Sequence, residues 1–152
     1  PCACGRHGCL ETRASKRALL EKIRTLKNDR NLSFEALTEL YQSGDAEAVQ
    51  AGNTAARYLG TAIANQVNNL LPDSLVLTGS MMNLGKGFHD ELKRVISELA
   101  FPLASDSLSI RFSEPDDETS AVGAAMLVAR KLMNNFAEFN RACPVAAPHS
   151  PV

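Results

Sequence analysis

Residues 70–79 read LLPDSLVLTG, and this stretch decides the fold class. Pro72 ends a helical pattern that starts at Asp45 and repeats apolar or small residues every three or four positions. Residues 75–78 then form a short apolar run that Gly79 stops, and a brief, punctuated run of this kind is typical of a buried strand. A long helix followed directly by a strand predicts an α/β protein.

The segments on either side continue this alternation. Apolar residues at helical or alternating spacing predict helices at residues 14–26, 34–42, 88–99 and 119–135, and a strand with one buried face at residues 108–112. Ser33 can cap the second of these helices. From residue 137 to residue 152 proline and alanine become frequent, so we expect a disordered tail there. Two strands with flanking helices predict an α/β layer with a short sheet.

Composition places the chain among soluble single-domain proteins. It has 152 residues, 45% of them hydrophobic, and a formal net charge of -1, which suffices for one compact core. No apolar run approaches the roughly 18 residues of a membrane span. Of the four cysteines, Cys143 stands apart from the rest, so they do not suggest a disulfide framework. We therefore expect a cytoplasmic protein with no membrane partner.

The first nine residues, PCACGRHGC, bring three cysteines close together: Cys2, Cys4 and Cys9. Thiolates bind zinc, and a structural zinc site takes four ligands. Gly5 and Gly8 give the loop the backbone freedom to wrap around an ion. His7 is the nearest candidate for the fourth ligand, and a donor outside this chain is the alternative. Three reduced thiols without a metal are also possible, but their close spacing favours zinc.

The string CACGRHGCLE at residues 2–11 resembles the CxCGxxGCxE signature of the ROK family, which comprises repressors and sugar kinases. The continuation ETRAS, the segment NNLLPDSLVLTG and the later VGAA are also similar to that family, in the same order along the chain. The resemblance implies the second, C-terminal lobe of an actin-like, ribonuclease-H-like ATPase-type fold. This lobe would span residues 1–136, with a zinc loop at residues 2–9.

The resemblance also implies roles for individual residues. Cys2, Cys4 and Cys9 would hold a structural zinc ion together with a histidine from an upstream Glu-x-x-His element, so His7 would not be the fourth ligand. Glu11 occupies the place of a glutamate that hydrogen-bonds sugar hydroxyls. A carboxylate can accept strong, charge-assisted bonds from two adjacent hydroxyls, which suits that role. Without the family, Glu11 could be an ordinary acidic residue at a helix start.

Nucleotide binding would require a glycine-rich turn, as in the sugar kinases of this family. The corresponding turn contains Gly79 and Ser80, followed by Met81 and Met82, whose bulk we expect to hinder the approach of a phosphate. A lone glycine is a weak signal, so an ordinary turn is favoured. The acidic run at residues 116–118 is interpreted as a solvated helix start, and no catalytic residue is predicted in this chain.

The resemblance therefore predicts the sugar-sensing effector half of a repressor-like transcriptional regulator. It would bind a monosaccharide or amino sugar near Glu11, and DNA through a module outside this chain. The alternative is the C-terminal half of a ROK sugar kinase that uses ATP and magnesium and is inactive as this chain alone. A homodimer is also expected. A stripe of small residues could serve its interface or pack inside the lobe, and interior packing is favoured: Ala55, Ala56, Gly60 and Ala64.

Overall fold

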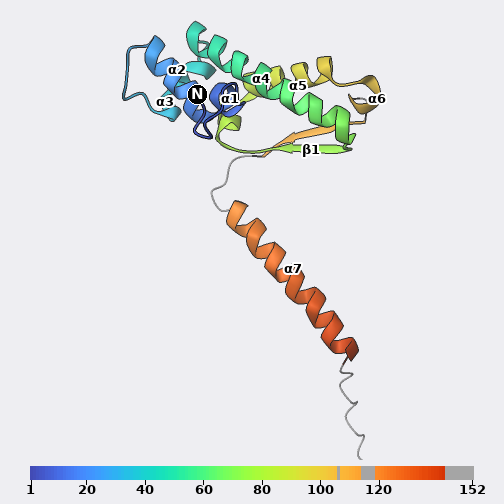
Figure 1. The fold of residues 1–152 in the computed structure, drawn as a ribbon. Coiled ribbons are helices and arrows are strands. Elements are labelled where there is room, and N and C mark those ends of the chain that lie inside the picture. The colour runs from blue at the N-terminus through green and yellow to red at the C-terminus, as the bar shows by residue number, and fades with distance from the viewer. Residues whose placement is uncertain (106, 114–118, 143–152) are drawn as a thin grey trace, which may run out of the picture. The chain divides into compact units, whose positions relative to one another are not determined.

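The computed structural model describes residues 1–105, 107–113 and 119–142. These residues fall into two units, Pro1–Pro115 and Asp116–Val152. The elements of the first unit, drawn in Figure 1, are α1 (Glu11–Ala14), α2 (Lys16–Leu26), α3 (Phe34–Gln42), α4 (Ala46–Leu70), β1 (Ser74–Leu77), the 3-10 helix η1 (Ser80–Leu84), α5 (Lys86–Leu99), α6 (Pro102–Ser105) and β2 (Ser109–Phe112). The second unit contains α7 (Thr119–Ala142).

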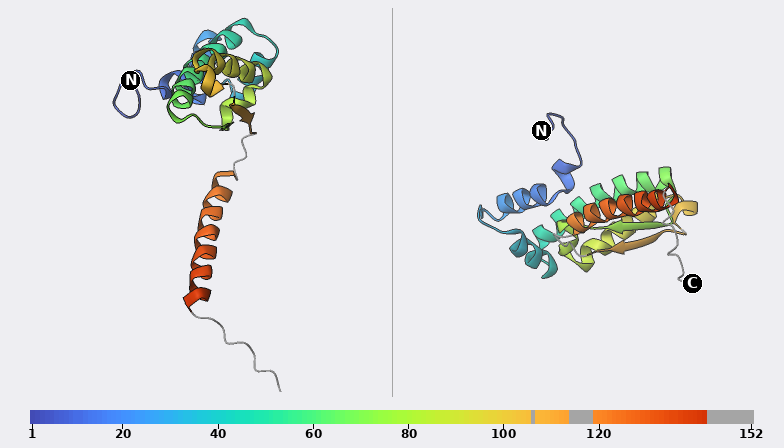
Figure 2. Two further views of the ribbon diagram at one scale, coloured as in Figure 1. Left: turned by 90° about the vertical axis from the view of Figure 1, so that its right-hand side faces the viewer. Right: turned by 90° about the horizontal axis from the view of Figure 1, so that it is seen from below.

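The two strands form a parallel sheet, with Ser74 opposite Ser109 and Leu77 opposite Phe112. Helices α4 and α5 lie along one face of this sheet, as Figures 1 and 2 show from different sides. On that face Leu77 and Phe112 pack against the main hydrophobic core. The predicted α/β layer with a short sheet is therefore present.

The prediction that β1 is a buried strand is wrong for one of its faces. Val76 points away from the core and is 58% exposed, while Leu75 and Leu77 are half-buried. The helices of this unit cover a single face of the sheet (Figure 1), and Val76 lies on the other face. Strand β2 shows the predicted alternation, because Ile110 is half-buried and Arg111 is exposed.

Side-chain caps fix where α2, α3 and α4 begin. The Ser33 hydroxyl accepts a hydrogen bond from the Ala36 backbone N–H at 3.1 Å, which confirms the predicted cap of α3. The single helix predicted at residues 14–26 is instead divided at Ser15, whose extended backbone ends α1 and whose hydroxyl caps α2. A serine that bonds the backbone ahead of it favours a cap over a helix interior, and apolar spacing alone does not reveal this.

Small residues on α4 allow close packing within the unit. Those that are buried are Ala48, Ala51, Gly52, Ala55, Ala56, Gly60 and Ala64. A Cβ atom at Gly60 would lie 2.8 Å from Cγ1 of Val95 on α5, so the two helices approach too closely there for a larger residue. The stripe thus packs inside the unit, as the favoured interpretation expected, and the homodimer remains a prediction.

The last helix is longer than the sequence pattern indicated. It was expected to end at Asn135, but α7 runs to Ala142, so residues 137–142 of the predicted tail are helical. The sequence from residue 124 to residue 143 contains neither glycine nor proline, which leaves the helix without a breaker. The rest of the tail, residues 143–152, and the acidic run 116–118 lie outside the described residues. No helix in the described part of the chain is long and apolar enough to cross a membrane.

Candidate metal centre

The three cysteines of the opening loop converge. The Sγ atoms of Cys2, Cys4 and Cys9 all lie within 4.8 Å of one another. The Cys2 backbone N–H donates to the Arg6 carbonyl at 2.7 Å, and the Gly5 N–H donates to the Cys2 carbonyl at 2.9 Å, so the chain turns tightly between the first two thiols. Gly5 has a φ of +82°, a left-handed conformation that glycine adopts readily.

This arrangement fits a tetrahedral metal ion with three of its ligands in place. Zinc–sulfur bonds of about 2.3 Å put the sulfurs of a tetrahedral site roughly 3.8 Å apart. The Sγ atoms of Cys4 and Cys9 are 3.5 Å apart, and all three thiols are free of disulfides. His7 is not among the ligand atoms that converge in the described residues. The cysteines therefore suit a soft cation such as zinc and offer three of the four donors that a tetrahedral site takes.

The thiols of the loop differ in their electrostatic environment. Hydrogen bonding by the Arg6 backbone, and then by the thiols of Cys2 and Cys9, holds the pKa of Cys4 below its ordinary value. The hydrogen bonds that Cys9 shares with Cys4 and Cys2 raise its own pKa instead. Before any metal binds, Cys4 is therefore more readily deprotonated to a thiolate than Cys9.

The cysteine loop continues directly into α1, where Glu11 is the first residue. The Thr12 hydroxyl and the Thr12 backbone N–H both donate to the Cys9 carbonyl, at 2.7 Å and 3.0 Å. These bonds fix the start of the helix relative to the third cysteine. The position of Glu11 thus depends on the conformation of the loop.

Glu11 lines a surface hollow of about 380 Å³. Its carboxylate is exposed and has no ion-pair partner among the described residues. Most of the other lining residues are polar, and the full set is Pro1, Thr12, Arg17, Ala18, Glu21, Lys22 and Thr25. Arg17 and Glu21 form an exposed ion pair at 3.8 Å within this hollow. The hollow offers hydrogen-bonding groups of both kinds to a ligand rich in hydroxyls.

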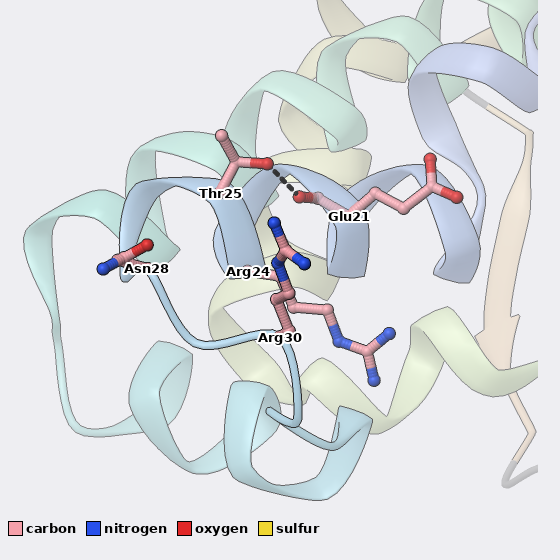
Figure 3. A pocket seen from close by; sticks show the side chains of 5 residues that line it. All are labelled: Glu21, Arg24, Thr25, Asn28 and Arg30. Atoms are coloured by element: carbon pink, nitrogen blue, oxygen red, sulfur yellow. Dashed lines mark hydrogen bonds between the residues drawn. The ribbon is translucent and has the colours of Figure 1, made fainter.

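A second hollow, of about 430 Å³, adjoins the first at Glu21 and Thr25 and is shown in Figure 3. In that view the Glu21 carboxylate points away from the guanidinium groups of Arg24 and Arg30. Arg24 Nε donates to the Leu32 carbonyl at 2.8 Å, and the Thr25 hydroxyl donates to the Glu21 carbonyl at 2.9 Å. The first bond fastens α2 to the loop that follows it, and the second lies within α2.

The turn after β1 contains Gly79 and Ser80, the residues of the kinase alternative. Gly79 has a φ of +111°, which requires glycine, and a Cβ atom there would meet nothing within 4 Å. Met81 and Met82 are 8% and 6% exposed, so their side chains are buried in the core. The expectation that their bulk hinders access to the turn is therefore wrong. Neither Gly79 nor Ser80 lines the hollow at Glu11.

Sequence reasoning missed an aromatic stack at the end of β2. The rings of His89 and Phe112 lie 3.9 Å apart and nearly parallel, at 6°. Lys93 Nζ is 5.3 Å from the centre of the Phe112 ring, and His89 Nε2 is 2.9 Å from the Met82 carbonyl oxygen. The helical spacing of His89 and Lys93 was visible in the sequence, but their common partner on a strand was not.

Comparison with known proteins places the chain in a family. The model of the ROK family matches residues 1–131. The chain belongs to the ROK family. It is 29% identical over 150 residues to a xylose repressor of Caldicellulosiruptor bescii, in an alignment that covers 91% of this chain and 37% of the repressor.

Two solved ROK structures resemble the chain. One is a ROK family transcriptional regulator described as a homologue of the E. coli MLC protein, with a TM-score of 0.66 and 27% identity, over 73% of this chain and 30% of the regulator. The other is a ROK hexokinase from Thermus thermophilus, with a TM-score of 0.69 and 28% identity, over 84% of this chain and 42% of the hexokinase. The predicted fold class, an α/β lobe of the actin-like ATPase type, is confirmed. The chain spans about a third of the length of the repressor that it matches.

Proposed function

We propose that this ROK chain is the effector-binding part of a sugar-responsive transcriptional regulator. The observation that carries the proposal is the convergence of three thiols beside Glu11, whose exposed carboxylate has no ion-pair partner among the described residues. A xylose repressor and a transcriptional regulator are among its relatives. The effector would be a monosaccharide or an amino sugar.

In this proposal the metal has a structural role. Zinc bound by Cys2, Cys4 and Cys9, with a fourth donor outside the described residues, would hold the loop in one conformation. The bonds from Thr12 to the Cys9 carbonyl would then transmit that rigidity to the first turn of α1. A carboxylate held in this way can accept hydrogen bonds from two adjacent sugar hydroxyls without losing much side-chain freedom on binding.

Regulation requires that the sugar changes the affinity of a distant DNA-binding module. Such coupling needs two arrangements of the full protein that bind the sugar with different affinity. The DNA-binding module would lie outside this chain, and a homodimer would present two copies of it to an operator. These parts of the proposal concern the whole protein.

A sugar kinase is the second candidate, because a ROK hexokinase is among the structural relatives and no atom lies within 4 Å of a Cβ position at Gly79. ATP phosphates would then contact the backbone at Gly79 and Ser80, with magnesium bound to the nucleotide. A single glycine in the turn favours this function less than a glycine-rich loop would. This chain by itself would not phosphorylate a sugar.

The test is calorimetric titration of the full-length protein with a panel of neutral and amino sugars. We expect one sugar to bind, and Glu11→Gln to weaken that binding by roughly 10-fold or more with the melting temperature unchanged. Glu39→Gln, an exposed glutamate outside the hollow, is the control and should bind as the parent does. Equal affinity of the Glu11→Gln protein would remove Glu11 from the site. Sugar-dependent ATP turnover, with no effect of sugar on DNA binding, would favour the kinase instead.

A further inference from the structure

The cysteine loop also has the geometry of a site for covalent oxidation. The Sγ atoms of Cys4 and Cys9 are 3.5 Å apart, and a disulfide bond of about 2.0 Å requires them to approach by only about 1.5 Å. Cys4 is exposed, so a small oxidant in solution can reach its sulfur directly. Cys9 is half-buried beside it and can act as the resolving thiol.

The loop favours this pair over pairs that include Cys2. The Cys2 backbone is held on both sides, because its N–H donates to the Arg6 carbonyl and its carbonyl accepts from the Gly5 N–H. The same two bonds hold Gly5 and Arg6, so the freer part of the segment between Cys4 and Cys9 is at Gly8, whose backbone is left-handed and has no neighbour within 4 Å of a Cβ position. The segment between Cys4 and Cys9 can therefore adjust to shorten the distance between the two sulfurs.

We propose that Cys4 and Cys9 form a reversible disulfide and that this bond releases the metal of the loop. The disulfide follows from the geometry of the thiols alone. Its effect on the metal and on ligand binding at Glu11 rests on the proposed function. A peroxide is the class of oxidant that fits an exposed thiolate.

The reaction balances in two steps. The Cys4 thiolate attacks a peroxide oxygen, so that an S–O bond forms, the O–O bond breaks, and the departing hydroxide takes up a proton to become water. The Cys9 thiolate then attacks the Cys4 sulfur, the S–S bond forms, the S–O bond breaks, and the departing hydroxide takes up a second proton to leave as water. The two thiols lose two electrons in total, and hydrogen peroxide is reduced to two waters.

Oxidation would change both the metal and the start of α1. Two sulfurs that share a disulfide no longer carry thiolate charge, so Cys2 would remain as the one thiolate ligand of this loop. Because Thr12 bonds to the Cys9 carbonyl, a shift of Cys9 would also move Glu11. The switch would thus lower the affinity for the effector when thiols are oxidised and restore it on reduction.

The sequence allows a direct test. Trypsin cleaves after Arg6, between the two cysteines, so a Cys4–Cys9 disulfide joins residues 7–13 to the peptide that ends at Arg6. The full-length protein is treated with hydrogen peroxide, once zinc-loaded and once after chelation, and digested without reduction. We expect the linked peptide in both samples, complete loss of it after thiol reduction, and release of roughly one zinc ion per chain from the loaded sample.

Cysteine-to-serine variants identify which two cysteines form the disulfide. Cys2→Ser and Cys143→Ser should both retain the linked peptide, and Cys9→Ser should abolish it. The peptide that ends at Arg6 carries both Cys2 and Cys4, so the unaltered protein shows that Cys9 is linked to one of them, and the Cys2→Ser protein assigns the link to Cys4. Neither measurement depends on whether Cys9→Ser folds. A link through Cys2 or Cys143, or irreversible oxidation of Cys4 without a link, would overturn the proposal. A linked peptide without zinc in the untreated protein would support the disulfide and count against the metal, which separates the two hypotheses.

Discussion

Replacing Gly52 by alanine tests the packing that positions the first unit's helices. The ring of Tyr41 on α3 lies against Gly52 on α4, and a Cβ atom there would be 2.7 Å from Tyr41 Cδ2. On its other side the ring faces Gly87 of α5, where a Cβ would be 3.4 Å from Tyr41 Cε1. Confined between two helices, the ring has little room to move away from a new methyl group.

The size of the effect follows from three contributions. Overpacking of a core costs about 1–3 kcal/mol. Displacing the ring also strains the hydrogen bond of 2.7 Å from the Tyr41 hydroxyl to Asn53 Oδ1, worth about 1 kcal/mol. Alanine has a higher helix propensity than glycine, which offsets about 1 kcal/mol of this cost. We therefore expect Gly52→Ala to lower the free energy of unfolding by about 1–3 kcal/mol.

Urea denaturation followed by circular dichroism measures this loss, which should appear as a midpoint lower by roughly 1 M. Gly87→Ala is the matched control, because its methyl group would make ordinary van der Waals contact with the same ring and should change stability by less than about 1 kcal/mol. Combining Gly52→Ala with Tyr41→Leu should remove most of the Gly52→Ala penalty. If Gly52→Ala is as stable as the parent, or if its penalty is unchanged without the ring, the packing argument is refuted.

Three further predictions concern the metal, a helix cap and an ion pair. Chelation of zinc from the full-length protein, or Cys9→Ser, should lower the melting temperature and the affinity for sugar together, both measured by calorimetry. Unchanged melting in protein that elemental analysis shows to be free of metal would contradict a structural role for zinc. Ser33→Ala should lower the free energy of unfolding by about 0.5–2 kcal/mol in urea denaturation, because it removes the cap of α3, whereas Ser43→Ala, at the other end of that helix, should have a smaller effect. The hydrogen bonds that Asp45 accepts from Lys27 and from the Ala48 N–H hold the pKa of Asp45 below its ordinary value. The Asp45 carboxylate therefore stabilises the folded protein above the unfolded pKa of about 3.9, and this stabilisation is lost as pH falls through the folded pKa. Asp45→Asn keeps a capping side chain but should reduce the free energy of unfolding at pH 7 and flatten the acid limb of a stability–pH curve. An unchanged acid limb would show that Asp45 does not cause the loss of stability at low pH.

Much of the local structure could be predicted because local rules decide it. The cap at Ser33 and the end of α4 before Pro72 depend on groups within four residues along the chain. Two predicted helix boundaries were wrong, for different reasons. The break at Ser15 is a local competition between a cap and a helix interior, and the extension of α7 reflects the absence of a breaker rather than the presence of a signal.

Some features of the candidate site could likewise be predicted from the sequence, and others could not. Three cysteines within eight positions, with Gly5 and Gly8 between them, can be brought together by one tight loop, so the sequence predicted the thiol cluster. The turn at Gly79 was misjudged, because the sequence does not show that Met81 and Met82 point into the core. The stack of His89 on Phe112 joins residues from a helix and a strand, and no spacing rule reveals such a pair.

By itself the sequence determined the alternation of helices and strands, the cap at Ser33, the thiol cluster and the family. Those features depend on residues close together along the chain, where geometry is fixed by bond lengths and hydrogen-bond periods. Only the tertiary structure decided which face of β1 is exposed at Val76 and how closely α4 can approach its neighbours at Gly52. These outcomes depend on where distant segments meet, and that is set by the packing of the whole core rather than by any one stretch of residues.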